Sequence, residues 1–182
     1  MTQPKQLAII GGGYIGLEFA STYAKLGTKV TVFERGDALL AREDPAIARA
    51  ATEALQAQGI EIVFSVDVTA IEGESTATIR TVNHDDYAGY DAVLMATGRR
   101  PATMSLNLPA AGVATDERGA IVVDETLRTS RSHIWAMGDV TGGPQFTYAS
   151  LDDFRIVRSQ LLGDGLYLSL IHISEPTRLG MI

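Results

Sequence analysis

The chain opens with short apolar runs separated by glycines, a pattern typical of alternating strands and helices. Residues 6–10 (QLAII) form an apolar run that predicts a buried parallel strand. Apolar positions at helical spacing predict a helix over residues 15–26, which Gly27 ends. Residues 29–34 (KVTVFE) alternate with β-branched positions and predict a second strand. This order within about 30 residues is one βαβ unit and predicts the first half of a Rossmann core.

A second helix and a third strand extend this pattern. Asp44 followed by Pro45 predicts an N-cap with proline at the first helical position, opening an alanine-rich helix that runs to about residue 58. Residues 61–64 then predict a third strand.

The end of this first region predicts an antiparallel insertion and a return to the sheet. Residues 67–82 resemble a hairpin around Gly73, which would replace a crossover helix, and residues 92–96 predict another buried strand. We therefore expect an α/β fold with a Rossmann-like NAD-binding domain over residues 1–98.

The pattern changes after Pro101 to short strands in a loop-rich stretch. Strands are expected at 121–123 and 134–137, and apolar spacing predicts a helix over about 150–162. Residues 99–165 contain too little regular structure to close a domain alone.

Composition narrows the possible partners. The formal charge is −7 and the 15 Lys and Arg are scattered, which disfavours a nucleic-acid or anionic-membrane surface. There are no cysteines and the three histidines lie far apart, so we expect no metal site. No apolar run reaches the roughly 18 residues that a membrane span needs, which favours a cytoplasmic protein with a small-molecule partner.

Three glycines after the first strand form a dinucleotide-binding pattern. Gly11, Gly13 and Gly16 (GGGYIG) give GxGxxG directly between a predicted strand and a predicted helix. The first glycine permits a tight turn, the second lets backbone approach a pyrophosphate, and the third allows the helix to pack closely on the strand. The helix dipole would then face the phosphates.

An acidic residue lies where the ribose of a bound nucleotide would be recognised by hydrogen bonds. Glu34 ends the second strand, about 20 residues beyond the glycines, where a carboxylate can accept both ribose hydroxyls of an adenosine. It would repel a 2′-phosphate, which favours NADH over NADPH. Arg35 is a competing feature, because an adjacent guanidinium could tolerate that phosphate.

Two further motifs follow strands, at residues 96–101 (ATGRRP) and 134–139 (IWAMGD). Asp139 could accept a sugar or ribityl hydroxyl, or could be a plain aspartate turn. Asp152 and Asp153 are a tempting carboxylate pair, but we expect them in the first turn of a helix, where acids need no catalytic role.

The ordered motifs resemble those of the pyridine nucleotide-disulfide oxidoreductase family, which includes dihydrolipoamide dehydrogenase, glutathione reductase and mercuric reductase. Within this family, the sequence of the motifs and of the residues around them is most similar to the bacterial reactive-chlorine-resistance flavoprotein reductases. The resemblance covers about residues 3–165. It implies FAD and NADH as cofactors. It also implies that residues 99–165 are the C-terminal half of a split FAD-binding domain.

The resemblance assigns roles to individual residues. Tyr14 would cover the nicotinamide pocket, Glu18 would lie near the carboxamide, and Asp139 would bind the FAD ribityl chain. Alternatively, Tyr14 is a tyrosine that packs on its helix, and Glu18 is a glutamate exposed to solvent, without a role in binding. The full expected cofactor-binding set is Gly11, Gly13, Tyr14, Ile15, Gly16, Glu18, Glu34, Gly98, Gly138 and Asp139.

The chain departs from the family by the absence of whole segments. The redox-active cysteine pair, the His-Pro acid/base motif and the first glycine pattern for FAD are missing, so we expect a fragment without catalytic residues. The whole enzyme would pass a hydride from NADH to flavin and on to a disulfide or other acceptor, as a homodimer formed through a C-terminal domain. The alternative is a non-catalytic nucleotide-binding module.

The family pattern stops near the C-terminus. Residues 168–178 (LSLIHISEPTR) resemble a translated library-preparation adapter, so residues 166–182 are expected to be non-native and to pack against nothing. A native amphipathic tail is the alternative.

Overall fold

The computed structural model describes residues 2–82 and 85–169 and divides the chain into two compact units, Met1–Gly98 and a second that begins at Arg99. The first unit has the expected α/β fold. Its parallel strands and helices are β1 (Gln6–Ile10), α1 (Tyr14–Lys25), β2 (Lys29–Phe33), α2 (Pro45–Gln56), β3 (Glu61–Val63) and β7 (Ala92–Met95). Its antiparallel strands are β4 (Val68–Glu72), β5 (Ala77–Thr81) and β6 (Asp86–Tyr90).

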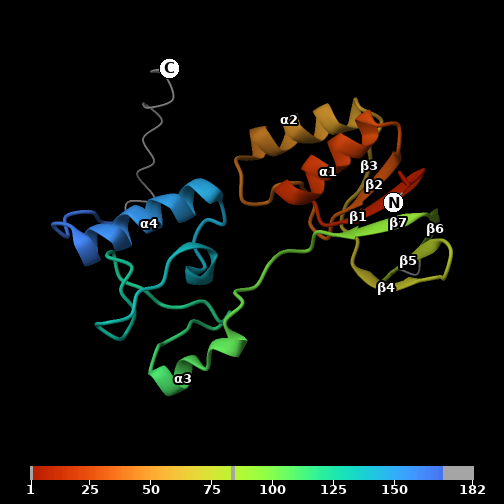
Figure 1. The fold of residues 1–182 in the computed structure, drawn as a ribbon. Helices are drawn as coiled ribbons and strands as arrows, with labels where there is room; N and C mark the ends of the chain where they lie inside the picture. Colours follow the sequence, from red (N-terminus) through yellow and green to blue (C-terminus); the bar gives the residue numbers. More distant parts are fainter. Residues whose placement is uncertain (1, 83–84, 170–182) are drawn as a thin grey trace. The chain divides into compact units, whose positions relative to one another are not determined.

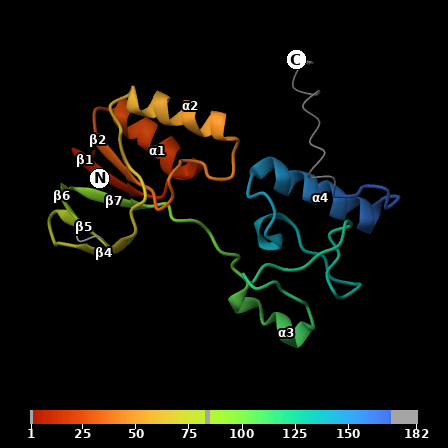
Figure 2. The same ribbon diagram turned by 180° about the vertical axis from the view of Figure 1, so that it is seen from behind.

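The parallel sheet has the order β3-β2-β1-β7, so the first strand of the chain lies at its centre. Leu7 in β1 pairs with Val30 on one side and with Ala92 on the other. Both helices cover one face of this sheet, and the antiparallel strands lie on its opposite side (Figure 1, Figure 2). All strand carboxyl ends therefore point to one edge, the edge at which ligands bind in open α/β sheets.

Alternating residues of β1 supply two cores. Leu7 and Ile9 pack toward the helices with other buried aliphatic residues, whereas Ala8 and Ile10 pack toward the antiparallel sheet with Phe33. A strand buried on both faces explains why the run QLAII is apolar throughout rather than alternating. The ring of Phe33 makes edge-to-face contacts with Tyr87 and Tyr90 on this second side.

The antiparallel insertion has one strand more than the expected hairpin. β5 pairs with both β4 and β6, and the third strand, β6, was not predicted from the sequence DYAGY. Gly89 has a φ of 96° and lies where the pairing register shifts, and the strand is short and contains Asp, Ala and Gly, residues that are depleted in strands, so its sequence gives a weak strand signal.

The second unit contains less strand structure than expected. Its elements are η1 (Met104–Leu106), α3 (Leu108–Ala111), η2 (Gly138–Thr141) and α4 (Thr147–Leu162). The strands predicted at 121–123 and 134–137 are wrong as extended strands. They appear only as isolated bridges, Thr115 with Ile121, Val123 with Thr129, and Arg128 with Trp135. A β-branched run becomes a strand only where a neighbour completes the ladder, and the described residues supply single pairs.

The final helix also begins earlier than predicted. α4 starts at Thr147 rather than near residue 150, which moves Asp152 and Asp153 out of the first turn. The expectation that both acids occupy the dipole-stabilised first turn is therefore wrong. Asp153 is buried, and its contacts are described below.

The tail makes contacts where it is described. The Ser169 amide donates to the Glu125 carbonyl at 2.7 Å, and Gln160 Nε2 donates to the Tyr167 carbonyl at 3.0 Å. The side chains of Leu166, Tyr167 and Leu168 are exposed, which agrees with the expectation that the tail does not pack, although these bonds attach its described part to the second unit. Residues 170–182 lie outside the described part. Across residues 2–82 and 85–169 no helix has the length and apolarity needed to cross a bilayer.

Candidate functional site

The three glycines form the turn that joins β1 to α1. The Gly11 amide donates to the Phe33 carbonyl at 2.8 Å, which ties the turn to the end of β2. Gly11 has a φ of 114°, and a Cβ there would lie 2.4 Å from the carbonyl oxygen of Ala96. Only glycine permits both this backbone conformation and this close approach to the chain that leaves β7.

Gly13 and Gly16 meet different surroundings. A Cβ on Gly16 would lie 2.2 Å from the Gly11 carbonyl oxygen, so this position is closed by backbone. A Cβ on Gly13 would meet no atom within 4 Å. Packing within the chain therefore explains Gly11 and Gly16, whereas Gly13 leaves open a space that a side chain would fill and a pyrophosphate could occupy.

Gly13 is also the N-cap of α1, with extended backbone angles and no side-chain cap. The first intrahelical bond runs from the Leu17 amide to the Gly13 carbonyl at 3.0 Å. The amides at the start of a helix are directed along its axis, and with the dipole they favour an anion at this end. Ile15, in the first turn, is exposed.

Glu34 follows β2 and holds the glycine turn from the side. Its Oε2 accepts a hydrogen bond from the Gly12 amide at 2.7 Å, and its Oε1 accepts one from the Gly36 amide at 2.7 Å. Its own amide donates to the Val63 carbonyl at 2.8 Å, which anchors the backbone at the edge of the sheet. The carboxylate is thus oriented beside the turn that carries Gly13.

Sequence reasoning missed Gly12. A Cβ at this position would lie 2.6 Å from Cδ2 of Leu39 and 2.8 Å from Oε2 of Glu34. Its carbonyl accepts from the Leu40 amide at 3.1 Å, which folds the loop after β2 over the turn. The available sequence feature was that Gly12 is the middle one of three consecutive glycines, at a position where the GxGxxG pattern places no requirement.

Tyr14 and Glu18 lie on one face of α1 and line a groove of about 320 Å³ with α2. The Tyr14 hydroxyl donates to the carboxylate of Glu43, a residue of the loop before α2. Ser21 and Gln58 also line the groove, and the Ser21 hydroxyl donates to Oε1 of Gln58 at 2.8 Å. The structure therefore brings these two site residues together.

Gly98 is the last residue of the first unit and follows β7. It has a φ of 120°, and a Cβ on it would meet nothing within 4 Å. The positive φ is a conformation that glycine adopts without strain.

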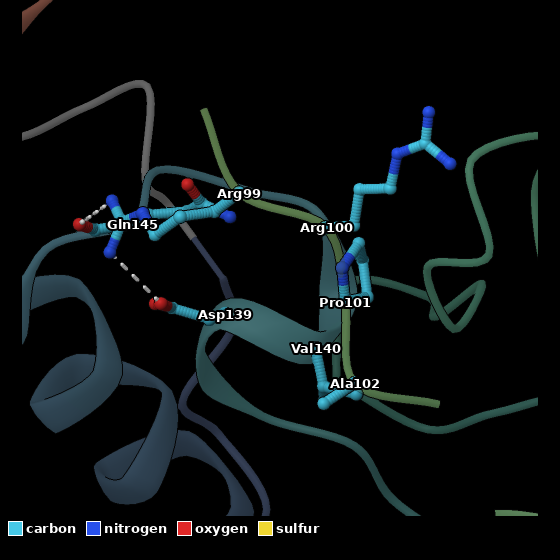
Figure 3. Close-up of a pocket in the computed structure, with 7 residues that line it drawn as sticks. All are labelled: Arg99, Arg100, Pro101, Ala102, Asp139, Val140 and Gln145. Atoms are coloured by element: carbon cyan, nitrogen blue, oxygen red, sulfur yellow. Dashed lines mark hydrogen bonds and ion pairs between the residues drawn. The ribbon is translucent and has the colours of Figure 1, made fainter. Parts of the chain in front are cut away.

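Asp139 lies in the second unit, in the short turn η2 that Gly138 begins. Its Oδ2 is 3.4 Å from Nη1 of Arg99, and Nη2 of Arg99 donates to the Gln145 carbonyl at 3.1 Å (Figure 3). These residues line a cavity of about 490 Å³, together with Arg100, Pro101, Ala102 and Val140. Sequence reasoning did not single out Arg99, although it belongs to ATGRRP.

A carboxylate in this cavity is available to hydroxyl groups. The side chain of Asp139 is 50% exposed, and its ion pair with Arg99 is long for a charge-assisted hydrogen bond. The Gly138 amide donates to the buried Asp153 at 2.8 Å, a contact that sequence reasoning also missed.

The geometry defines a class of protein. A glycine turn at the carboxyl edge of a parallel sheet, an acid at the end of β2 and a helix N-terminus are the features shared by Rossmann-like α/β domains. The family model for pyridine nucleotide-disulphide oxidoreductases matches residues 1–153, and the chain belongs to this family.

Known proteins support this membership. The chain is 51% identical over 162 residues to the probable pyridine nucleotide-disulfide oxidoreductase RclA of Escherichia coli K12. The aligned stretch covers 89% of this chain and 36% of that protein. It is 45% identical to the dihydrolipoyl dehydrogenase of Chlamydia pneumoniae, covering 76% of this chain and 30% of that enzyme. A solved structure of E. coli RclA in complex with Cu(II), described as an HOCl-induced flavoprotein disulfide reductase, matches with a TM-score of 0.85 at 50% identity.

The structural match covers 91% of this chain and 38% of the RclA chain. The present chain therefore spans about a third of the length of the relatives it matches. The E. coli relative is thus described both as a pyridine nucleotide-disulfide oxidoreductase and as a flavoprotein disulfide reductase.

Proposed function

We propose that residues 1–98 bind NADH, with the pyrophosphate in the turn formed by Gly11, Gly13 and Gly16. The observation that carries this proposal is the contrast among the glycines. A Cβ would strike backbone at Gly11 and Gly16 but would enter open space at Gly13. A glycine that packing does not require is explained by a ligand that needs its space.

Glu34 supplies the preference for NADH over NADPH in this proposal. Its two oxygens already accept from the amides of Gly12 and Gly36, so the carboxylate is fixed before a nucleotide arrives. Each oxygen retains acceptor capacity for a ribose hydroxyl, and the fixed negative charge opposes a 2′-phosphate. Arg35 is exposed in the same loop and is the residue that could weaken this preference.

Tyr14, Ile15 and Glu18 complete the proposed nicotinamide end of the site. They occupy the first two turns of α1, adjoining the turn that would hold the pyrophosphate. Their positions on one helix are consistent with contact to one end of an extended dinucleotide. Gly98 belongs to the same proposed set through its place after β7.

Residues 99–165 form, in the same proposal, part of an FAD site. Asp139 and Gly138 border a cavity whose half-exposed carboxylate can accept ribityl hydroxyls. Bound flavin would accept a hydride from NADH and pass electrons to a disulfide or another acceptor. The chain's own part is to hold and orient the two cofactors.

The whole enzyme is proposed to be a cytoplasmic homodimer, formed through a domain that the matched stretch does not include. Support comes from the family membership and from the use of NADH, a soluble cofactor of the cytoplasm. The terminal acceptor would be a disulfide or another oxidant of similar potential.

Isothermal titration of NADH into the 182-residue chain tests the nucleotide assignment. We expect weak, saturable binding at one site. ADP-ribose should also bind, because the glycine turn and Glu34 contact the half that it shares with NADH, whereas nicotinamide mononucleotide should bind less well. Failure of both NADH and ADP-ribose to bind would overturn the proposal.

A further inference from the structure

The second unit contains a buried carboxylate that belongs to none of the motifs. Asp153 lies on α4, and its side chain is 2% exposed. Its Oδ2 accepts a hydrogen bond from the Gly138 amide at 2.8 Å. Its Oδ1 is also buried and has no hydrogen-bond partner among the described residues. Burial of an acid is costly without compensating bonds, so this position calls for a specific role.

Asp153 acts on the turn that carries Asp139. Gly138 begins η2 and has a φ of 76°, so the chain reverses there in a conformation that suits glycine. Ser150, one helical turn before Asp153, lies against the same glycine, since a Cβ on Gly138 would be 3.0 Å from its Oγ. Two residues of α4 therefore contact Gly138: Asp153 accepts a hydrogen bond from its amide, and Ser150 packs beside its Cα.

The direction of the Asp139 side chain depends on this backbone. Its carboxylate is half exposed, and its pair with Arg99, at 3.4 Å, is the one side-chain bond that it makes among the described residues and is too long to orient it strongly. The turn itself is held by the Thr141 hydroxyl, which donates to the Gly138 carbonyl at 2.9 Å, and by Asp153. Removing Asp153 would leave the Gly138 amide buried against the helix without an acceptor.

We propose that Asp153 is a positioning residue whose bond to Gly138 sets the turn that presents Asp139 to the adjoining cavity. The inference rests on the proposed function only in taking flavin hydroxyls as the ligand of Asp139. Burial raises the pKa of Asp153, the Gly138 bond opposes this, and the neighbouring charge of Asp152 adds to the rise. A carboxyl protonated on Oδ1 still accepts at Oδ2, so the bond does not depend on the charge.

NMR of the 182-residue chain without flavin tests the positioning. In the wild-type chain, a scalar coupling across the hydrogen bond should join ¹⁵N of Gly138 to the side-chain carboxyl carbon of Asp153. Asp153→Ala should speed amide exchange at Gly138 by about tenfold or more and change the residual dipolar couplings of Asp139. Asp153→Asn keeps an acceptor and should restore both values. The matched control, Asp152→Ala, should change neither.

Absence of the coupling would overturn the proposal even if the alanine variant fails to fold. Unchanged exchange in Asp153→Ala, or equal loss in the alanine and asparagine variants, would overturn it as well. Each result concerns Gly138 and Asp139 alone, so it stands apart from whether the protein binds flavin.

Flavin affinity provides the functional arm of the test. Residues 1–165 can replace the matching stretch of the E. coli relative, and FAD binding to this chimera can be followed by flavin fluorescence. Asp139→Ala and Asp153→Ala should each weaken FAD, and the double variant should bind no worse than Asp139→Ala, because Asp153 acts through Asp139. Additive losses would overturn the positioning role. An unaffected Asp139→Ala chimera would instead remove the proposed flavin role of Asp139.

Discussion

The backbone amide of Gly12 donates a hydrogen bond to Oε2 of Glu34 across 2.7 Å. The other oxygen of Glu34 accepts from the Gly36 amide, so both sides of the carboxylate are held by backbone. Bonds of this kind to a charged acceptor are among the stronger hydrogen bonds in proteins. The acid proposed to contact the ribose therefore also ties the glycine turn to the loop after β2.

Replacement of Glu34 should separate the two nucleotides. Glu34→Ala removes an oriented acceptor for the ribose hydroxyls, and loss of hydrogen bonds to a charged group costs about 1.5 to 3 kcal/mol, or about tenfold to a hundredfold in affinity. NADPH should lose less, because the variant also removes a charge that repels the 2′-phosphate. Isothermal titration with both nucleotides measures the difference.

Asp37→Ala is the matched control for this variant, since Asp37 is an exposed acid in the same loop. It should leave both affinities near their wild-type values. Equal losses of NADH and NADPH binding in Glu34→Ala would contradict the assigned preference.

Two alanine substitutions in the glycine turn should differ in their effects on stability and on NADH binding. Gly13→Ala places its Cβ in open space, so the stability cost should be limited to the poorer N-cap, about 1 kcal/mol, while NADH binding is lost because the methyl group occupies the pyrophosphate position. Gly16→Ala forces a Cβ to within 2.2 Å of the Gly11 carbonyl and should lower the melting temperature markedly. Thermal unfolding and NADH titration of both variants test the pair. A Gly13→Ala variant that binds NADH normally would place the pyrophosphate elsewhere.

Features whose residues lie close together in the sequence could be predicted from it, and features that depend on distant residues could not. The first βαβ unit and the Asp44 cap were predicted because their patterns are local, and the Asp44 carboxylate accepts from the Ala46 amide at 2.7 Å as a cap should. Gly12 was missed because its crowding comes from Leu39, far outside the glycine motif. The contact of Asp153 was missed because both acids were expected in the dipole-stabilised first turn of a helix, whereas its partner is Gly138, 15 residues earlier.

The isolated chain should purify without bound flavin and should show no NADH-driven diaphorase activity. Asp139 can offer one or two hydrogen bonds, each worth about 0.5 to 3 kcal/mol, against an association cost of several kcal/mol. Along α4, Tyr148, Leu151 and Phe154 are exposed at helical spacing, an apolar surface that a neighbouring domain could cover. Absorbance near the flavin bands and a dye-reduction assay check this prediction.

The chimera with the E. coli relative provides the positive counterpart to that experiment. It should be yellow and should reduce the dye with NADH. A yellow, active preparation of the 182-residue chain alone would contradict the expectation that the matched stretch is insufficient for flavin binding.

Asp124 should make stability depend on acid pH. Burial acts to raise the pKa of Asp124, but hydrogen bonds from the Thr126 side chain and the amides of Arg128 and Thr126 outweigh it and hold the pKa below its usual range. A lowered folded pKa favours the folded state above the unfolded value of about 3.9, and this contribution is lost as pH falls through the folded value. Asp124→Asn should therefore lower the melting temperature at pH 7.

The difference from wild type should shrink as pH falls below the folded pKa of Asp124, where the wild-type carboxyl is also neutral. Glu125→Gln alters the adjacent exposed acid and should show no such pH-dependent difference. A deficit in Asp124→Asn that stays constant from pH 7 to acid would contradict the assigned pKa shift.

The central position of β1 has a consequence for the order of folding. β1 can pair with β2 as soon as residue 33 is made, but its other edge waits for β7, which pairs Leu7 with Ala92. Closing a loop of this length carries an entropic cost before the contact stabilises anything, and such distant parallel pairing forms slowly. Gly11 meets the Ala96 carbonyl only after that step. During synthesis, the nucleotide turn should therefore reach its final shape only after the chain has passed residue 96.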